Sequence, residues 1–200
     1  RWDRATGALL DARPLNGATF GALSDDGRYA ALAASNGVVS VIDTTTGETL
    51  HTFTEFRTTV SLFDFSDDGR YLIGASVPAN ENSRPDMRVI VWDVQTGRSV
   101  HIFDAHRTPL QAVALSADGQ YAASSSAASD NGQESAQILI WNVATGRVQQ
   151  TWPNSATVLT FSPSGDALLA VTDGPTLLRE IATGNPLQSW SETVIGAAVF

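Results

Sequence analysis

The side chains best suited to chemistry are three histidines and several neighbouring carboxylates. His51 and His101 occupy equivalent places in a repeated pattern, which predicts a structural role for both rather than a catalytic one. The Asp-Asp pairs at 25–26 and 67–68 are candidate cation ligands, but each lies in a short turn with no further ligand nearby in the sequence. Hydrogen bonding within the turns accounts for these carboxylates better than metal binding does.

No other pattern in the chain indicates catalysis. Asp130-Asn131-Gly132 with Glu134 is only partly similar to a calcium loop, because the alternating oxygen ligands are missing. The absence of Cys excludes thiolate nucleophiles, disulfides and Cys-ligated metals. The sequence also lacks a Gly-rich phosphate loop, a Gly-x-Ser-x-Gly elbow and a His-Glu-x-x-His motif. We therefore expect a protein that is not an enzyme, with no cofactor and no metal site.

Composition narrows the classes of partner. The 200 residues carry 12 basic and 21 acidic side chains, a formal net charge of −9, and every basic residue counted there is Arg. Nucleic-acid binding depends on clustered cations, so it is not expected. No apolar run approaches the roughly 18 residues of a membrane span, so direct membrane insertion is not expected either.

Composition says less about source and compartment. Arg in place of Lys in an Ala-rich chain is typical of a GC-rich bacterial genome. The lack of Cys slightly favours a reducing cytoplasm, but it also fits an exported or membrane-associated bacterial location, so the compartment stays open.

These residues belong to a pattern that repeats along the whole chain. A Ser-x-x-Gly turn occurs at 24–27, 66–69, 116–119 and 162–165. A Thr-Gly pair follows later in each repeat, with glycines at 7, 47, 97, 146 and 184. These glycines lie 40, 50, 49 and 38 positions apart, a period that indicates a repeat architecture.

Each repeat predicts four short strands and no helix. In the first repeat we expect strands at 18–23, 29–34, 38–42 and 49–53, with Asn36-Gly37 forming a type I′ hairpin. The corresponding strands of the later repeats are expected at 60–65, 71–77, 88–92 and 99–103; at 110–115, 121–126, 137–141 and 148–152; and at 157–161, 167–171, 176–179 and 187–190. Aromatic residues recur at the fourth-strand ends and are expected in the core: Phe53, Phe103, Trp152 and Trp190.

The repeats resemble those of the WD-repeat β-propellers. Trp2-Asp3 and Trp92-Asp93 carry the dipeptide that names this family. Variants of it stand at the equivalent positions: Trp141-Asn142, Ile42-Asp43 and Arg179-Glu180. Ala105-His106, ten residues before Ser116, is similar to the family's Gly-His pair. The related Tyr-Val-Thr-Asn repeat propellers are an alternative, which the stretch VIDTTTGETL also resembles.

The resemblance implies an all-β propeller of four complete, four-stranded antiparallel blades, at about 14–53, 54–103, 104–152 and 153–190. It also implies partial blades at 1–13 and 191–200, so that the chain is expected to be a fragment of a seven-bladed ring.

The family also has a buried hydrogen-bonded tetrad of His, Ser or Thr, Asp and Trp. The resemblance implies that the third repeat supplies all four members: His106, Ser124, Asp130 and Trp141. It implies two members in the second repeat, Asp86 and Trp92.

Two adjacent repeats carry long polar loops between their second and third strands, 78–85 and 127–136, where the other two have tight Asn-Gly and Asp-Gly connections. Long loops on a rigid scaffold often carry function, although solvated insertions without function are the alternative. We expect partner contacts from Asn80, Glu81, Asn82, Ser83, Arg84, Ser129, Asp130, Asn131, Gln133 and Glu134.

The resemblance implies a non-catalytic scaffold or adaptor that binds protein partners through these loops. Two alternatives stay open. The segment could be the propeller part of a larger enzyme, or a fixed structural subunit of a multiprotein assembly, including a membrane-associated one.

Overall fold

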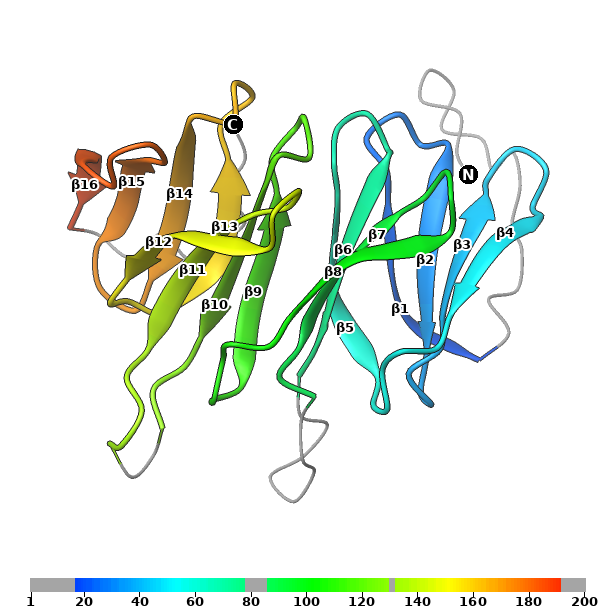
Figure 1. The fold of residues 1–200 in the computed structure, drawn as a ribbon, viewed down its shortest axis with the longest axis horizontal. Helices are drawn as coiled ribbons and strands as arrows, with labels where there is room; N and C mark the ends of the chain where they lie inside the picture. Colours follow the sequence, from blue (N-terminus) through cyan, green and yellow to red (C-terminus); the bar gives the residue numbers. More distant parts are fainter. Residues whose placement is uncertain (1–16, 78–85, 130–131, 192–200) are drawn as a thin grey trace.

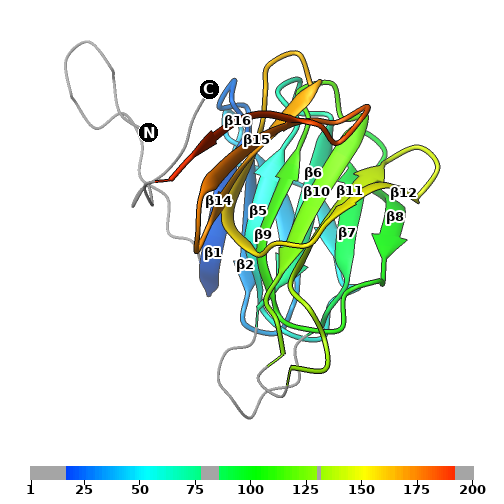
Figure 2. The same cartoon turned by 90° about the vertical axis from the view of Figure 1, so that its left-hand side faces the viewer.

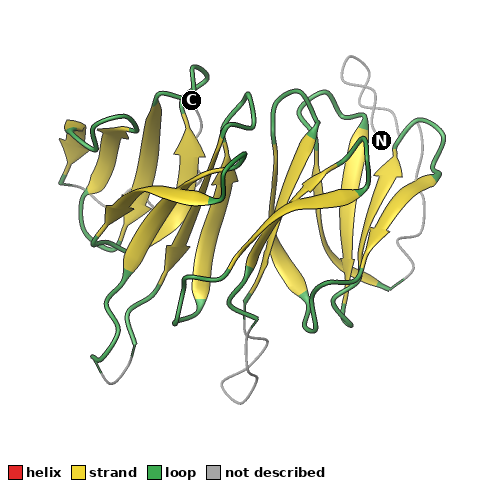
Figure 3. Ribbon diagram, viewed as in Figure 1, coloured by secondary structure: helices red, strands yellow, loops and turns green. Residues whose placement is uncertain are grey.

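The computed structural model describes residues 17–77, 86–129 and 132–191, and within these ranges it contains strands, turns and loops but no helix (Figures 1 and 3). Residues 1–16, 78–85, 130–131 and 192–200 are not described. The partial blades expected at 1–13 and 191–200 therefore lie outside the described residues, apart from Ser191.

The described strands form four antiparallel sheets, which we call blades 1 to 4. Blade 1 contains β1 (Ala18–Leu23), β2 (Tyr29–Ala34), β3 (Val39–Asp43) and β4 (Thr49–Phe53). Blade 2 contains β5 (Val60–Phe65), β6 (Tyr71–Ser76), β7 (Val89–Asp93) and β8 (Arg98–Phe103). Blade 3 contains β9 (Leu110–Leu115), β10 (Tyr121–Ser126), β11 (Gln137–Asn142) and β12 (Arg147–Trp152). Blade 4 contains β13 (Ala156–Phe161), β14 (Ala167–Thr172), β15 (Thr176–Glu180) and β16 (Pro186–Trp190).

The all-β prediction is confirmed, and each strand end lies within one residue of its predicted place. In every blade the strands pair in chain order, so each blade is a simple up-and-down sheet. The first strands of successive blades, β1, β5, β9 and β13, contact one another in that order. The four sheets therefore stand side by side as an arc with its first strands along the hub (Figures 1 and 2).

The arc has two rims. The Ser-x-x-Gly and Thr-Gly turns lie along one rim, the upper side of Figure 1, which we call the turn rim. The connections from second to third strands, and from each blade to the next, lie along the opposite rim, which we call the loop rim. Antiparallel pairing within each blade produces this separation, because alternate connections must fall at opposite ends of a sheet.

One turn differs from its prediction. The structure places only Gly37 at positive φ (85°), and no described residue other than Gly has a positive φ, so Asn36 does not adopt the type I′ conformation. Instead Gly37 N–H donates to Ala34 O, and Ala34 N–H donates to Val38 O. This is a three-residue loop in which Gly follows a regular turn, and it is the next most common hairpin connection.

The core lies between blades rather than within them. Separate hydrophobic clusters join blades 1 and 2, blades 2 and 3, and blades 3 and 4. Their largest fully buried members include Trp92, Ile73, Ile140 and Trp152. Each sheet therefore buries its two faces only where a neighbouring blade covers them, as propeller packing requires.

The two end faces of the arc, on blade 1 and blade 4, have no neighbouring described blade, and apolar side chains on them are exposed. Leu23 on β1 is 66% exposed and Trp190 on β16 is 42% exposed, because no described blade covers either face. The prediction that Trp190 lies in the core is therefore wrong for the described arc, whereas Phe53, Phe103 and Trp152 are buried as expected.

Neighbouring blades also lock together along the turn rim. A Cβ atom on Gly119 would lie 2.2 Å from the Tyr71 ring of the preceding blade, and Gly119 also has φ of 65°. A Cβ on Gly146 would similarly lie 2.8 Å from the His101 ring. The glycines thus provide positive φ and also space for the side chain of the blade before. His101 Nε2 lies 3.3 Å from Ala144 O, which supports the structural role inferred for this histidine.

Candidate functional site

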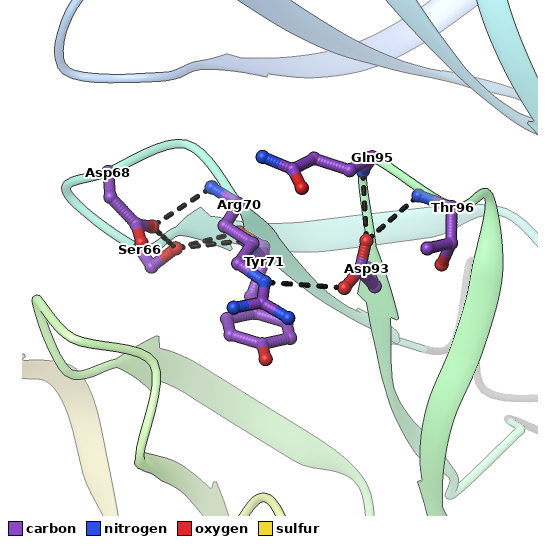
Figure 4. Close-up of polar contacts among 7 residues, drawn as sticks. All are labelled: Ser66, Asp68, Arg70, Tyr71, Asp93, Gln95 and Thr96. Atoms are coloured by element: carbon purple, nitrogen blue, oxygen red, sulfur yellow. Dashed lines mark hydrogen bonds and ion pairs between the residues drawn. The ribbon is translucent and has the colours of Figure 1, made fainter.

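The repeated motifs build the turn rim through side-chain hydrogen bonds, shown for blade 2 in Figure 4. Ser66 Oγ donates to Asp68 Oδ1 (2.7 Å) and accepts from Tyr71 N–H (2.9 Å). Asp93, of the Trp-Asp dipeptide, accepts from Thr96 N–H at 2.9 Å, from Gln95 N–H and from Arg70 Nε. Partial burial opposes ionisation of Asp93, but the bonds from Thr96 and Arg70 outweigh it and lower the pKa of Asp93. The Ser, Asp and Thr residues of the repeated motifs therefore stabilise the turns through these hydrogen bonds.

The two carboxylates of each Asp-Asp pair have different roles. Asp26 and Asp68 each accept bonds within their own turn, and the N–H of Arg28 and the Ser24 hydroxyl lower the pKa of Asp26. Asp25 and Asp67 instead line a cavity at the hub. Within the described residues, no group of three His, Asp or Glu side chains is placed to hold a metal ion.

Blade 3 holds a buried polar chain. Ser124 Oγ lies 2.7 Å from His106 Nε2 and accepts from Trp141 Nε1 at 2.9 Å. Burial lowers the pKa of His106 to about 4, so the ring is neutral at physiological pH. His106 Nδ1 is buried and has no partner among the described residues. Asp130, the fourth residue that the resemblance implied, lies outside the described residues.

Blade 2 buries its Trp in the same place but with different partners. Gly74 stands where blade 3 has Ser124, and a Cβ there would lie 2.7 Å from Cζ3 of Trp92. Trp92 Nε1 donates to Glu55 Oε1 at 3.1 Å, and the indole stacks on Phe53 of blade 1. Sequence reasoning missed Glu55, although a Gly at the hydroxyl position signals that the indole needs another acceptor.

Asp86 and Trp92 are not bonded to each other. The Arg88 guanidinium donates through Nε to Asp86 Oδ1 (2.7 Å) and through a second nitrogen to Asp86 Oδ2, and it also donates to Glu55 O (2.6 Å). The same group lies over the Phe56 ring at 5.8 Å. Desolvation raises the pKa of Asp86, but the Arg88 bonds outweigh it and lower the pKa overall. Arg88 is a second residue that sequence reasoning missed.

The loop rim holds the predicted partner-binding residues only in part. Asn80, Glu81, Asn82, Ser83, Arg84, Asp130 and Asn131 lie outside the described residues. Ser129 N–H donates to Glu134 O (2.9 Å), Glu134 N–H donates to Ser129 Oγ (2.8 Å), and Gln133 and Glu134 are exposed. At the base of this loop, Thr108 Oγ1 donates to Ala127 O at 2.6 Å. The described part of 127–136 is thus a hydrogen-bonded loop fastened to the preceding connection.

In the part of the chain that is described, no helix has the length and apolarity required to cross a membrane.

Comparison with known proteins identifies the repeat. Residues 97–142, from β8 through β11, match the family described as WD domain, G-beta repeat. No curated protein matches the sequence.

Solved structures match nearly the whole chain. One is a chain in the crystal structure of the Mitotic Checkpoint Complex, with a TM-score of 0.72 and 16% identity over 95% of this chain. Another is the β-propeller domain of Myceliophteria thermophila Cps50 (Swd1), with a TM-score of 0.68 and 18% identity over 90% of this chain. This chain covers 56% of the length of each of those two chains.

Four sheets that correspond to about half of such a chain are consistent with a partial propeller. Residues 97–142 thus match a WD40 repeat, and the chain has the fold of part of a β-propeller.

Proposed function

We propose that this propeller is a non-catalytic scaffold that binds protein partners through loops 78–85 and 127–136 of blades 2 and 3. WD40 propellers typically serve as protein-interaction scaffolds, although a fold alone does not determine function. The observation that supports the proposal is that the described ends of both loops are held on the same rim by half-buried hydrogen bonds from Thr108 and Arg88.

At blade 3, the base of the loop is held twice. Thr108 Oγ1 and Ala127 O form one bond, and Ala127 N–H donates to Pro109 O to form another. Ser129 and Glu134 close the outer part of the loop. The loop residues that these bonds already hold lose less conformational entropy when a partner binds, which favours affinity.

At blade 2, the described chain resumes at Asp86, just before β7 begins at Val89. The side chain of Arg88 joins Asp86 to the main chain of Glu55 and lies over Phe56. This arrangement fixes the exit of loop 78–85 against the connection between blades 1 and 2. Both loops therefore start from firm bases on adjacent blades, which favours one continuous partner surface.

A fixed place in a larger assembly is the second candidate. One structurally similar chain comes from the Mitotic Checkpoint Complex, and membership of a complex is compatible with a partner-binding rim in this chain. The native mass of the purified protein separates the two candidates: a single stable high mass indicates a fixed subunit, and partner exchange on dilution indicates an adaptor.

The test is a quantitative pull-down with the intact protein. Loops 78–85 and 127–136 are each replaced by the Ser35-Asn36-Gly37 hairpin of blade 1. The matched control is Glu48→Ala with Gln95→Ala, two exposed polar residues on the turn rim. We expect partners recovered with the wild type and the control to be lost with the loop replacement. Unchanged recovery with the loop replacement would contradict the proposal.

A further inference from the structure

Two exposed arginines occupy equivalent positions on the loop rim, in the connections that lead into blades 2 and 3. Arg57 comes shortly before β5 and Arg107 shortly before β9, in connections that span 54–59 and 104–109. The connection into blade 4 is shorter, at 153–155, and contains no basic residue. The two arginines therefore belong to the same blades as the long loops 78–85 and 127–136.

The residue before each arginine is a buried ring. Phe56 is 4% exposed, and its carbonyl oxygen would lie 2.7 Å from a Cβ placed on Gly37, so this connection packs closely against the hairpin of blade 1. His106 is fully buried, with its Nε2 at 2.7 Å from Ser124 Oγ. The main chain that enters each arginine is therefore fixed by the core.

The residue after each arginine is a Thr that bonds to the base of a long loop. Thr58 Oγ1 lies 2.8 Å from Oγ of Ser76, the last residue of β6, which leads into loop 78–85. Thr108 Oγ1 donates at 2.6 Å to the carbonyl of Ala127, which begins loop 127–136. Each arginine is thus held between two anchors, beside the loop that is proposed to bind a partner.

The guanidinium groups are available to a partner. The Arg57 side chain forms no ion pair with a described residue. Arg107 lies 3.7 Å from a carboxylate oxygen of Asp104, and the two side chains are 62% and 67% exposed. Such exposed pairs add little stability, so a partner carboxylate can replace Asp104 at little cost. Arg88 on the same rim differs, because it is already bonded to Asp86.

The opposite rim carries the opposite charge. The Ser-x-x-Gly turns on the turn rim contain five carboxylates: Asp25, Asp26, Asp67, Asp68 and Asp118. Charge complementarity therefore directs an anionic partner away from the turn rim and towards the loop rim. Nucleic acid is a poor fit for this anion, because its binding depends on clustered cations and the chain has a net charge of −9.

We propose that the loop rim binds an acidic segment of a partner polypeptide, with carboxylates of that segment paired to Arg57 and Arg107. This inference rests on the proposed function, because it names the chemistry of the partner that the two loops bind. A guanidinium suits this role, since its planar fork can donate two parallel hydrogen bonds to one carboxylate. Because the arginines stand on adjacent blades, the segment needs more than one acidic residue and lies across the junction of blades 2 and 3.

The test compares two probes, fluorescein-labelled oligoglutamate and an oligoglutamine of the same length. Fluorescence anisotropy with the intact protein at low ionic strength gives a dissociation constant for each probe. We expect oligoglutamate to bind roughly tenfold more tightly, and added salt to weaken its binding, because exposed charges are screened. The net charge of −9 repels oligoglutamate, so its tighter binding requires a local cationic site. Equal binding, or tighter binding of oligoglutamine, would overturn the proposal.

A double variant then locates the site. Arg57→Ala with Arg107→Ala removes the two loop-rim cations. Arg98→Ala with Arg147→Ala is the matched control, because it removes the same charge from exposed positions at the starts of β8 and β12, on the turn rim of the same two blades. We expect roughly tenfold weaker oligoglutamate binding in the loop-rim variant and little change in the control. A thermal melt checks that both variants are folded, and equal losses in folded variants would show only general charge attraction, against the proposal.

The pull-down with the loop replacement separates this inference from the proposed function. A partner lost with the loop replacement and also with Arg57→Ala and Arg107→Ala supports both. A partner lost with the loop replacement but fully recovered with the arginine variant would overturn the acidic-segment inference and leave the loop proposal intact. Unchanged recovery with the loop replacement would contradict the loop proposal itself, whichever probe binds more tightly.

Discussion

Blades 2 and 3 each provide a hydrogen-bond acceptor for a buried Trp, but they use different residues to do so. Both bury a Trp near the end of the third strand, and both indole N–H groups need an acceptor away from water. Blade 3 uses Ser124, which also contacts His106, whereas blade 2 clears the space with Gly74 and uses Glu55. The sheet geometry thus sets where the ring packs, while the polar partner can come from different strands and loops.

The largest expected effect on stability comes from exchanging Gly and Ser between the equivalent positions of blades 2 and 3. In Gly74→Ser, the new Cβ would meet the fully buried Trp92 ring at 2.7 Å, so we expect a loss of about 3 kcal/mol in the free energy of unfolding. In the reverse change, Ser124→Gly, the Trp141 N–H and His106 lose their partner, and we expect a loss of about 2 kcal/mol. Urea unfolding measures both. A blade 2 that accepts Ser at position 74 without loss would show that the two Trp sites are interchangeable.

The second prediction concerns the loss of folding stability at acidic pH. The pKa of His106 falls from 6.5 to about 4 on folding, so the unfolded chain takes up a proton first as the pH drops. The stabilising effect of neutral His106 is therefore present above pH 6.5 and is lost as the pH falls towards 4. We expect the stability difference between wild type and His106→Gln to fall by about 3 kcal/mol between pH 7 and pH 4. Glu55→Gln in blade 2 is the control, and the same pH dependence there would contradict the assignment to His106.

The third prediction tests the junction between the two blades. The pKa of Asp64 is raised on folding to about 7, so the folded protein keeps a proton that the unfolded chain loses near pH 3.8. The resulting stability is complete below that pH and is lost as the pH rises through 7. Asn at this position can still accept from Leu115 N–H without a charge. We expect Asp64→Asn to be about 2 kcal/mol more stable than wild type at pH 8 and nearly equal to it at pH 4, as measured by urea unfolding. A pH-independent difference would mean that Asp64 titrates normally.

The smallest expected effect concerns Glu55 alone. Glu55→Ala leaves the buried Trp92 N–H without its acceptor, so we expect a loss of about 1.5 kcal/mol. Glu55→Gln keeps an oxygen acceptor and should change stability by less than about 0.5 kcal/mol. Indole N–H hydrogen exchange at Trp92 and Trp141 provides the local measurement. Faster exchange at Trp92 alone is expected in Glu55→Ala, and faster exchange at both would show that the blades share one opening motion.

The repeat made the fold predictable. Strand positions followed from the Ser-x-x-Gly and Thr-Gly turns, because these motifs fix a turn locally through Ser66, Asp68 and Asp93 and their equivalents. The type I′ turn predicted at Asn36-Gly37 is wrong, because this dipeptide fits two hairpin turns whose loops differ in length by one residue. A sequence motif therefore predicts the local backbone structure only where the motif is compatible with a single turn geometry.

The polar sites were less predictable. Glu55 reaches Trp92 across 37 positions, and Arg88 reaches the main chain of Glu55 across 33, so no local pattern marks either contact. The hub cavity combines Asp25, Asp64 and Asp67 from different blades or strands, and only the arc brings them together. Trp190 matched its repeat equivalents in sequence but is exposed, because burial depends on the neighbouring blade.

The central functional claim is that blades 2 and 3 together present a partner surface on the loop rim. Hydrogen–deuterium exchange on the intact protein, with and without a partner that needs the loops for recovery, tests it most directly. The account predicts slower exchange in loops 78–85 and 127–136 and unchanged exchange in the blade 1 and blade 4 connections at 35–38 and 173–175. Slower exchange confined to the turn rim, or equal in all four blades, would contradict it.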